Sequence, residues 1–402
     1  MLEVINKILI IFTNLYGLYF IVTALSIFKK EKKKENKNKY KNYFSILIPA
    51  RNEEKVIANL INSLNNMNYD KDRYEINVIL NNSKDNTYNV STNAGANVLR
   101  CKSKITTKGE ALKEAFRKIN DDKIDAYIIF DADNVVDKDF LKYMNESINN
   151  GYKVAQGFRD TKNNKCNWIS SSYTIYYFIQ NLFYNKSRKK LNRSASINGT
   201  GFMIKKEVID TIGFNVKTLS EDVEFTGICA LNDIKIDFVE KAVTYDEQAS
   251  DFKISWIQRK RWSKGCLQCY RNYFKSLIKK SNKPSCLDML LIYFAPILQI
   301  LSLFIVLIDL VSMYNNGIIQ NISMNTIIFS ISFAVIIYLL QVIVSLYSIY
   351  YFKRDIKKYI SGVFLFPVFL ITWLPINIVV LFRKNIKWEH IEHSKSLTIE
   401  DM

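Results

Sequence analysis

Long apolar runs lie at both ends of the chain and enclose a more polar middle. The first, Asn6–Phe28, covers 23 residues, which is long enough to cross a hydrocarbon core of about 30 Å. Three more runs close the chain, at Leu287–Tyr314, Ile327–Phe352 and Tyr359–Phe382. The pattern predicts an N-terminal membrane anchor, a soluble middle domain and a membrane-embedded C-terminal part.

The charges beside these runs predict how the chain sits in a membrane. Lys29–Lys41 holds eight lysines and two glutamates, and such basic segments stay on the cytoplasmic side. We therefore expect a multi-pass protein of the cell membrane with its N-terminus outside and its middle domain in the cytoplasm. The anchor is too long for the core of a signal peptide, so we expect it to be retained.

The last apolar run allows two arrangements. Basic pairs flank it and two prolines interrupt it: Lys357, Lys358, Arg383, Lys384, Pro367 and Pro375. A full span would place the tail outside, whereas a re-entrant or interfacial hairpin would keep it inside. The preference of basic residues for the cytoplasmic side favours the hairpin.

The middle of the chain alternates between short apolar runs and helical repeats. Three stretches read as buried strands: Phe44–Ile48, Ile76–Leu80 and Ala126–Phe130. Helical spacing follows the first at Val56–Leu64 and precedes the third at Lys108–Ile119. A β-α-β-α-β series predicts an α/β domain with a Rossmann-like, mostly parallel sheet and right-handed crossovers.

Polar side chains gather where the expected strands end. Arg51–Glu54 follow the first strand, Asn81–Asp85 the second, and Asp131 and Asp133 the third. Ligands bind such sheets at the carboxyl ends of the strands. Two carboxylates one residue apart can hold Mg²⁺ or Mn²⁺ together with phosphate oxygens. An isolated pair is more often a solvated turn, but its place beside two other polar strand ends favours the metal site.

Two later segments carry further candidates. INGTG places Gly199 and Gly201 where the backbone either approaches a ligand closely or makes a tight turn. LSED places Glu221 and Asp222 at the start of an expected helix, where acids interact favourably with the helix dipole. The alternative is a general base, with one carboxylate oriented by its neighbour.

A basic amphipathic helix is expected over residues 253–280. Its apolar face would hold Ile254, Ile257, Cys266, Tyr270, Phe274 and Leu277. Its cations would face polar surroundings: Arg259, Lys260, Lys264, Arg271 and Lys275. This pattern is typical of a helix at a membrane interface, so we expect Arg259 and Lys260 at lipid headgroups. Gln258, Arg261 and Trp262 share one helical face, where an arginine suits a diphosphate and an indole suits a sugar ring.

The charge and the cysteine and histidine content limit which molecules and metals the chain is expected to bind. The net charge of +18 fits nucleic acid, anionic lipid or phosphate-bearing substrates, and the apolar runs favour a lipid bilayer and exclude nucleic acid. Cys266 and Cys269 form a CxxC without a second pair or a nearby histidine, so reduced thiols are expected rather than zinc. His390 and His393 are expected to be solvated in the tail.

Five segments occur in the order PARNEE, KGEAL, DAD, SED and QRKRW. In this order they resemble the family-2 glycosyltransferases of the GT-A fold and, within them, the membrane polysaccharide synthases, from about Phe44 to Tyr270. The resemblance implies an inverting hexosyltransferase that uses a nucleotide-sugar donor. A UDP-sugar, with UDP-GlcNAc favoured, and a growing β-linked polysaccharide or glycan acceptor are expected. Accessory export subunits would be further partners.

The resemblance also implies roles for single residues. Asp131 and Asp133 would bind Mg²⁺ or Mn²⁺, and Asp222 would be the catalytic base beside Glu221. The set expected at the donor nucleotide is Pro49, Arg51, Glu53, Asn81, Lys108, Asp131 and Arg261. The set expected at the acceptor and the diphosphate is Gly199, Gly201, Gln258, Arg261 and Trp262.

One departure from the family pattern leaves alternatives open. The family usually has an aspartate after the second strand, whereas here Asn81 or Asn82 takes its place and Asp85 comes later. Uridine specificity is therefore less supported than catalysis. Two other functions remain: transfer of a single sugar to a lipid acceptor, which the QxxRW motif argues against, and a degenerate scaffold subunit of an export complex.

The expected organisation follows. The chain divides into 1–28 anchor, 29–42 basic linker, 43–252 glycosyltransferase domain, 253–280 interfacial helix, 287–314 and 327–352 transmembrane, 359–382 transmembrane or hairpin, and 383–402 tail.

Overall fold

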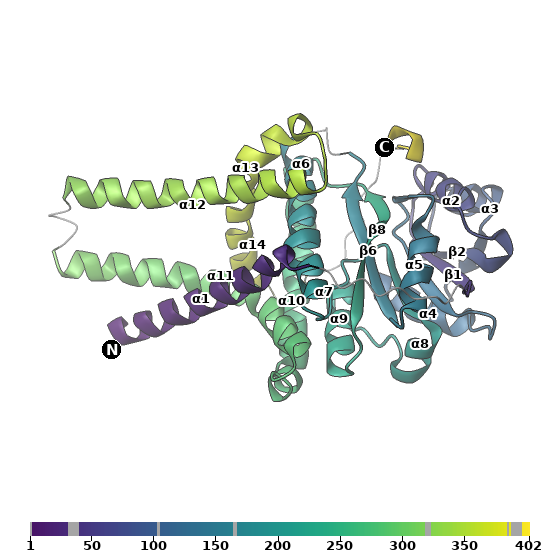
Figure 1. The fold of residues 1–402 in the computed structure, drawn as a ribbon, viewed down its shortest axis with the longest axis horizontal. Helices are drawn as coiled ribbons and strands as arrows, with labels where there is room; N and C mark the ends of the chain where they lie inside the picture. Colours follow the sequence, from purple (N-terminus) through teal and green to yellow (C-terminus); the bar gives the residue numbers. More distant parts are fainter. Residues whose placement is uncertain are drawn as a thin grey trace.

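A computed structural model describes residues 2–30, 40–102, 105–163, 167–317, 323–383, 386 and 396–402. Figure 1 shows an α/β domain from which long helices project in one direction, with the N-terminus near their far end. Most of the lysine-rich linker and both tail histidines lie outside the described residues.

One eight-stranded sheet forms the centre of the α/β domain, in the order β3-β2-β1-β4-β7-β6-β8-β5. Its strands are β1 (Phe44–Ala50), β2 (Tyr74–Leu80), β3 (Asn97–Arg100), β4 (Ala126–Ile129), β5 (Val135–Val136), β6 (Val154–Thr161), β7 (Phe202–Lys205) and β8 (Ile236–Asp246). Strands β1 to β4 pair in parallel, as do β6 and β8, while β7 runs antiparallel to both of its neighbours and β5 to β8. The sheet is therefore mixed and mostly parallel, close to the expectation.

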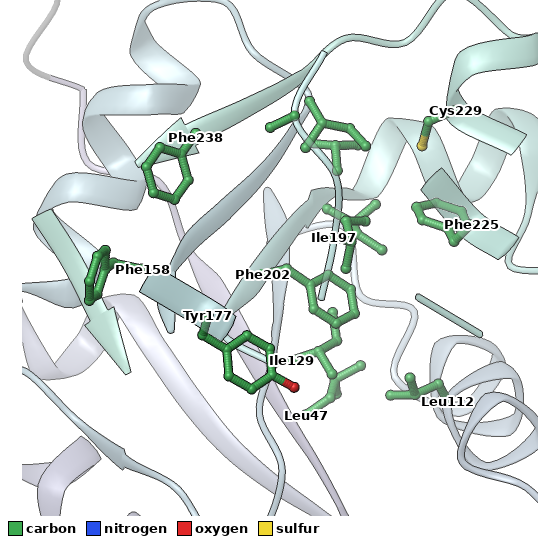
Figure 2. Packing of buried hydrophobic residues seen from close by; sticks show 14 of the residues in the cluster. Leu47, Leu112, Ile129, Phe158, Tyr177, Ile197, Phe202, Phe225, Cys229 and Phe238 are labelled. Carbon is green, nitrogen blue, oxygen red and sulfur yellow. The ribbon is translucent and has the colours of Figure 1, made fainter. Parts of the chain in front are cut away.

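Side chains of the central strands alternate between two apolar clusters. Leu47 and Ile129 pack into one cluster, whereas Ile46 and Ile48 pack into the other. Figure 2 shows the first, where Leu47, Leu112 and Ile129 lie close to one another. Because neighbouring residues of a strand point to opposite faces, a fully apolar strand such as β1 requires cover on both sides.

Short helices supply that cover and connect the strands. They are α2 (Ile57–Asn65), η2 (Lys71–Arg73), α3 (Thr87–Asn93), α4 (Lys108–Lys118), α5 (Phe140–Asn149), α6 (Trp168–Ile179), η3 (Gln180–Lys186), α7 (Ser187–Lys190), α8 (Lys206–Ile212) and α9 (Glu221–Leu231). The apolar stripe of α2 shows how sequence sets this packing, because Ile57, Leu60, Ile61 and Leu64 recur at helical spacing and are all buried.

Most of the remaining helices form the apolar part of the molecule: α1 (Leu2–Ala24), η1 (Leu25–Phe28), α11 (Pro284–Asn315), α12 (Met324–Tyr351), η5 (Ile356–Tyr359), α13 (Ile360–Ile371) and α14 (Trp373–Phe382). The two more polar ones are α10 (Phe252–Lys279) and η6 (Ile399–Asp401). Four described stretches are long and apolar enough to cross a membrane: Glu3–Phe28, Pro284–Asn315, Met324–Tyr351 and Ile356–Phe382.

The last of these stretches bends. Its two helices, α13 and α14, meet at Thr372, and in Figure 1 α14 runs across the direction of α11 and α12. At about 1.5 Å per residue, neither the 12 residues of α13 nor the 10 residues of α14 cover a hydrocarbon core of about 30 Å. The bend is compatible with the hairpin or interfacial arrangement.

Helix α10 lies between the α/β domain and the apolar helices, and this place corrects one expectation. Arg259 is fully buried rather than at lipid headgroups. Its Nη1 donates to the Phe369 carbonyl at 3.2 Å and to Thr372 Oγ1 at 2.6 Å, at the C-terminal end of α13. Lys264 is also buried and donates to the Arg383 carbonyl at the end of α14. Both cations thus donate hydrogen bonds to groups at the C-terminal ends of helices. They are buried because α10 is covered on more than one side.

A buried ion pair joins the α/β domain to the apolar helices. Arg188 of α7 lies 2.9 Å from Asp288 of α11, and both side chains are almost fully buried. The same carboxylate accepts from Tyr19 of α1 at 2.9 Å, while the guanidinium lies over the ring of Tyr184. Three elements far apart in sequence are therefore fixed together at one point.

Candidate active site

A cavity of about 720 Å³ lies where β1, β2 and β4 end, beside α10 and the apolar helices. Nearly all of the residues that the sequence singles out line it: Pro49, Arg51, Glu53, Asn81, Lys108, Asp131, Asp133, Gly199, Glu221, Asp222, Gln258, Arg261 and Trp262. The fold therefore brings the five sequence motifs together at one place.

Lys108 connects three of these motifs. Its Nζ donates to Asp131 Oδ1 at 2.5 Å and to the Gly199 carbonyl at 2.6 Å, and it lies 3.7 Å from Glu221 Oε1. Thr107 caps α4 in a capping box with Glu110, which fixes the position of the lysine. Burial by itself disfavours the ammonium, but the charges of Asp131 and Glu221 outweigh it and raise the pKa of Lys108.

Asp131 and Asp133 follow β4 and offer hard oxygen ligands. Asp133 is buried, and its Oδ2 accepts from the Glu247 amide at 3.0 Å. The described residues contain no group of three His, Cys, Asp or Glu side chains arranged to hold a metal ion. Two carboxylates on one turn fit Mg²⁺ or Mn²⁺ when the remaining ligands are water and phosphate oxygens.

Asp222 lies in the first turn of α9 and faces the cavity. Burial and the neighbouring charge of Glu221 raise its pKa from 3.8 to about 6. The loop before it is braced by Glu224, which accepts from the Lys217 and Thr218 amides at 2.7 Å and from the Tyr273 hydroxyl at 2.7 Å. A carboxylate with this pKa is mostly ionised at neutral pH and can accept a proton.

The two glycines of INGTG differ in position. Gly199 lines the cavity at φ +93°, and a Cβ there would lie 3.4 Å from Asp222 Oδ2. Gly201 is not among the residues that line the cavity, and its expected contact with a ligand stays a prediction. A Cβ on Gly201 would lie 2.5 Å from Thr244 Oγ1, so its lack of a side chain allows close strand packing.

Gln258, Arg261 and Trp262 all face the cavity from α10. Trp262 stacks against Trp373 of α14 at a centroid distance of 6.3 Å and meets Tyr173 edge-on at 6.0 Å. Within the described chain, Arg261 makes no hydrogen bond or ion pair, and Gln258 Oε1 is buried without a partner. Both polar groups are therefore available to a bound molecule.

The turn after β2 contains Asn81, Asn82 and Asp85, the candidates for the place of the family's aspartate. Asn81 lines the cavity, and its buried Oδ1 has no hydrogen-bond partner among the described residues. Asp85 is engaged elsewhere, because it accepts from the Glu54 amide at 3.1 Å and from Thr87 Oγ1 at 2.6 Å. Asn81 is therefore the residue of this turn that lines the cavity, and its contact with a nucleotide base stays a prediction.

A family model described as "Glycosyltransferase like family 2" matches residues 41–265, more than half of the chain. The chain belongs to glycosyltransferase family 2. Because the relatives of this family transfer sugars, the chain is a glycosyltransferase. The polysaccharide-synthase subtype stays a prediction.

This glycosyltransferase is similar to several curated proteins. It is 29% identical over 262 residues to "Probable glycosyltransferase YdaM" of Bacillus subtilis, covering 62% of this chain and 61% of that protein. It is 26% identical over 249 residues to the "Beta-monoglucosyldiacylglycerol synthase" of Trichormus variabilis, covering 59% and 52%. The match thus spans less than two thirds of the length of these relatives.

A solved structure supports the fold of the glycosyltransferase. It is the mannosyltransferase PcManGT from Pyrobaculum calidifontis, in complex with GDP-Man and Mn²⁺. The TM-score is 0.64 at 14% identity, with 96% of this chain and 100% of that chain covered. The two proteins therefore share a GT-A-like fold.

Two residues of the glycosyltransferase escaped the sequence reasoning. Arg159 of β6 lines the cavity, donates to the Asn198 carbonyl at 2.5 Å and pairs with Asp246 of β8 through Nε at 2.8 Å. Asp246 also accepts from Asn134 at 3.1 Å. The sequence shows an arginine and an aspartate in two separate segments. Their pairing cannot be inferred until β6 and β8 are known to be neighbours in the sheet.

Proposed function

We propose that the chain is a membrane-bound, inverting glycosyltransferase that moves a sugar from a nucleotide-diphosphate sugar to a hydroxyl group of a lipid acceptor. The carrying observation is the extent of the cavity. It runs from Lys108 and Asp131 at the sheet to Phe20 of α1, Pro296 of α11 and Trp373 of α14. An acceptor with its hydroxyl at Asp222 would have its remainder among apolar helices.

The donor occupies the sheet side of the cavity in this proposal. Asp131 and Asp133 would hold Mg²⁺ or Mn²⁺, which supplies positive charge beside the leaving diphosphate. Arg261 binds the diphosphate as a fork of donors. Asn81 meets the base, for which a UDP-sugar such as UDP-GlcNAc remains the expected donor.

Asp222 acts as the general base, oriented beside Glu221. Its carboxylate takes the proton of the acceptor hydroxyl while that oxygen bonds to the anomeric carbon from the face opposite the diphosphate. The bond between the anomeric carbon and the diphosphate oxygen breaks, and the nucleoside diphosphate leaves with the electron pair. An α-linked donor thus gives a β-linked product.

The apolar helices set the proposed orientation. Helices α1, α11 and α12 project together away from the α/β domain, as expected if they cross the bilayer with the N-terminus outside and the domain in the cytoplasm. Helices α13 and α14 are then interfacial, because each is too short to cross.

A growing β-linked glycan is the second candidate acceptor. Trp262, Trp373 and Tyr176 form a row of rings in the cavity wall, with Tyr176 and Trp373 stacked at 6.4 Å. Aromatic faces of this kind bind sugar rings. A chain of sugars could therefore occupy the same half of the cavity as a lipid headgroup.

The test uses the full chain in lipid vesicles with Mn²⁺ and a panel of radiolabelled nucleotide sugars. We expect label from one donor in an organic-extractable product of low mass. A water-soluble polymer would favour the second candidate. No nucleotide release from any donor would contradict the enzyme mechanism and favour the scaffold.

A further inference from the structure

Three amide side chains line the cavity from the apolar helices or from an element that contacts them. Gln299 belongs to α11 and Asn377 to α14, while Gln180 is the first residue of η3, which packs against α1. Asn377 donates to Gln299 Oε1 at 2.6 Å and is only 1% exposed. This hydrogen bond joins α11 and α14 across the cavity wall.

Two of these amides have unused hydrogen-bonding capacity. Among the described residues, Asn377 Oδ1 and Gln180 Oε1 are buried and lack partners. A buried amide oxygen without a partner costs free energy, so an oxygen of this kind in the cavity wall can accept a hydrogen bond from a bound molecule. Gln180 also begins a π-helical turn, a local widening that is frequent at functional sites.

The charges of the cavity are divided unequally. Its lining holds four cations, Arg51, Lys108, Arg159 and Arg261. None of them comes from α1, η3, α11, α13 or α14 in the part of the chain that the structure describes. The seven carboxylates of the lining also come from outside these helices. A phosphate in the half with the amides would therefore lose its hydration without a cation to pair with, which is unfavourable.

We infer that the three amides form an acceptor subsite that selects an uncharged, hydroxyl-bearing headgroup, such as that of an acylglycerol, over a phosphate-headed lipid. Each amide offers an acceptor and two donors, which matches hydroxyl groups, whereas the apolar helices receive the hydrocarbon. This inference rests on the proposed lipid acceptor and specifies its chemical class.

The experiment compares two acceptors in phosphatidylcholine vesicles that carry the full chain. One set contains dioleoylglycerol and the other contains polyprenyl phosphate, each with Mn²⁺ and the active nucleotide sugar. We expect transfer to dioleoylglycerol and none to polyprenyl phosphate. Transfer to polyprenyl phosphate alone would overturn this inference and leave the lipid-acceptor function standing. Transfer to neither lipid would overturn both.

Two variants test the amides themselves. Asn377→Leu and Gln180→Met should each raise the KM for dioleoylglycerol about tenfold, the loss expected for one hydrogen bond, with an unchanged donor KM. Gln180→Met decides the matter if Asn377→Leu does not fold. The control is Asn14→Leu on α1, an exposed amide that donates to the Ile10 carbonyl. A wild-type acceptor KM in Gln180→Met would overturn the assignment.

Discussion

Lys108 is the side chain through which the charges of the site meet. It holds Asp131, the Gly199 carbonyl and Glu221 around one ammonium. Without it, the carboxylates of two motifs would repel one another across the cavity. The lysine therefore arranges the site before a donor binds.

Replacing Asp222 with asparagine should remove the base while leaving its shape. We expect turnover to fall about 10²- to 10⁴-fold, with donor affinity nearly unchanged. Nucleotide release and calorimetric binding of the donor measure the two effects. Asp210→Asn, at an exposed carboxylate, is the matched control, and near-normal turnover in Asp222→Asn would show that another group is the base.

The pH profile should report the same carboxylate. Burial and Glu221 raise the pKa of Asp222 to about 6, and only the ionised form accepts a proton. The value of kcat/KM should therefore fall as the pH drops through about 6, whereas an ordinary aspartate would sustain activity to about pH 4. An acidic limb near pH 4 would contradict the buried environment of Asp222.

The sequence predicted the positions of residues that belong to a recognisable motif. It did not predict the burial of residues whose surroundings depend on distant packing. Asp131 and Asp222 stand in recognisable segments, and both line the cavity. Arg259 looked like a surface cation because helical periodicity shows only one face of α10. Its burial depends on α13, which lies more than a hundred residues away in sequence.

At the scale of elements, α10 is the helix on which the site is assembled. Gly265 lets it approach the SED loop, because a Cβ there would lie 2.1 Å from Ser220 Oγ and 2.8 Å from Ser220 N. Gln268 Oε1 accepts from the Leu219 amide at 3.0 Å. The position of the base thus depends on a helix from outside the sheet.

Gly265→Val should displace the SED loop. We expect kcat to fall by at least about tenfold, because small misplacements of reacting groups cost much of the rate, while membrane insertion persists. Kinetics beside flotation in vesicles separate the two effects. Ser276→Ala, at an exposed position of the same helix, should retain activity, and a fully active Gly265→Val would contradict the close packing.

Neighbouring cations of α10 should give opposite results. Arg259→Leu leaves the end of α13 without its donors and should lower the thermal midpoint, since such losses cost about 1–3 kcal/mol. Arg261→Ala should abolish transfer with the midpoint unchanged. Lys260→Ala should be mild in both measurements. If the three variants changed transfer activity and the thermal midpoint to the same extent, the separate structural and substrate-binding roles of Arg259 and Arg261 would be wrong.

The sequence predicted elements that local patterns define, but not strand pairings between residues far apart in the chain. β1, β2 and β4 were predictable because their apolar runs and intervening helical repeats are local patterns. The pairing of β6 with β8 was not predictable. The two strands lie about 80 residues apart in sequence, and their register shifts between Gly157 and Phe158. Such pairing is decided by the whole sheet.

At the scale of the molecule, the α/β domain and the apolar helices form one unit. The buried pair of Arg188 and Asp288 leaves a costly unpaired charge if either partner is removed. Sequence reasoning found both parts but not this joint, because neither residue belongs to a motif.

The part of the cavity that α1, α11 and α14 line has a kinetic consequence for the proposed lipid acceptor. An acceptor that arrives from the bilayer meets the enzyme in two dimensions, so the rate should follow the mole fraction of acceptor in the membrane. Adding inert phosphatidylcholine at constant bulk acceptor should slow transfer in proportion, which vesicle assays would measure. A rate that follows bulk concentration alone would mean delivery from water. On this view, the composition of the surrounding membrane sets the pace of the enzyme.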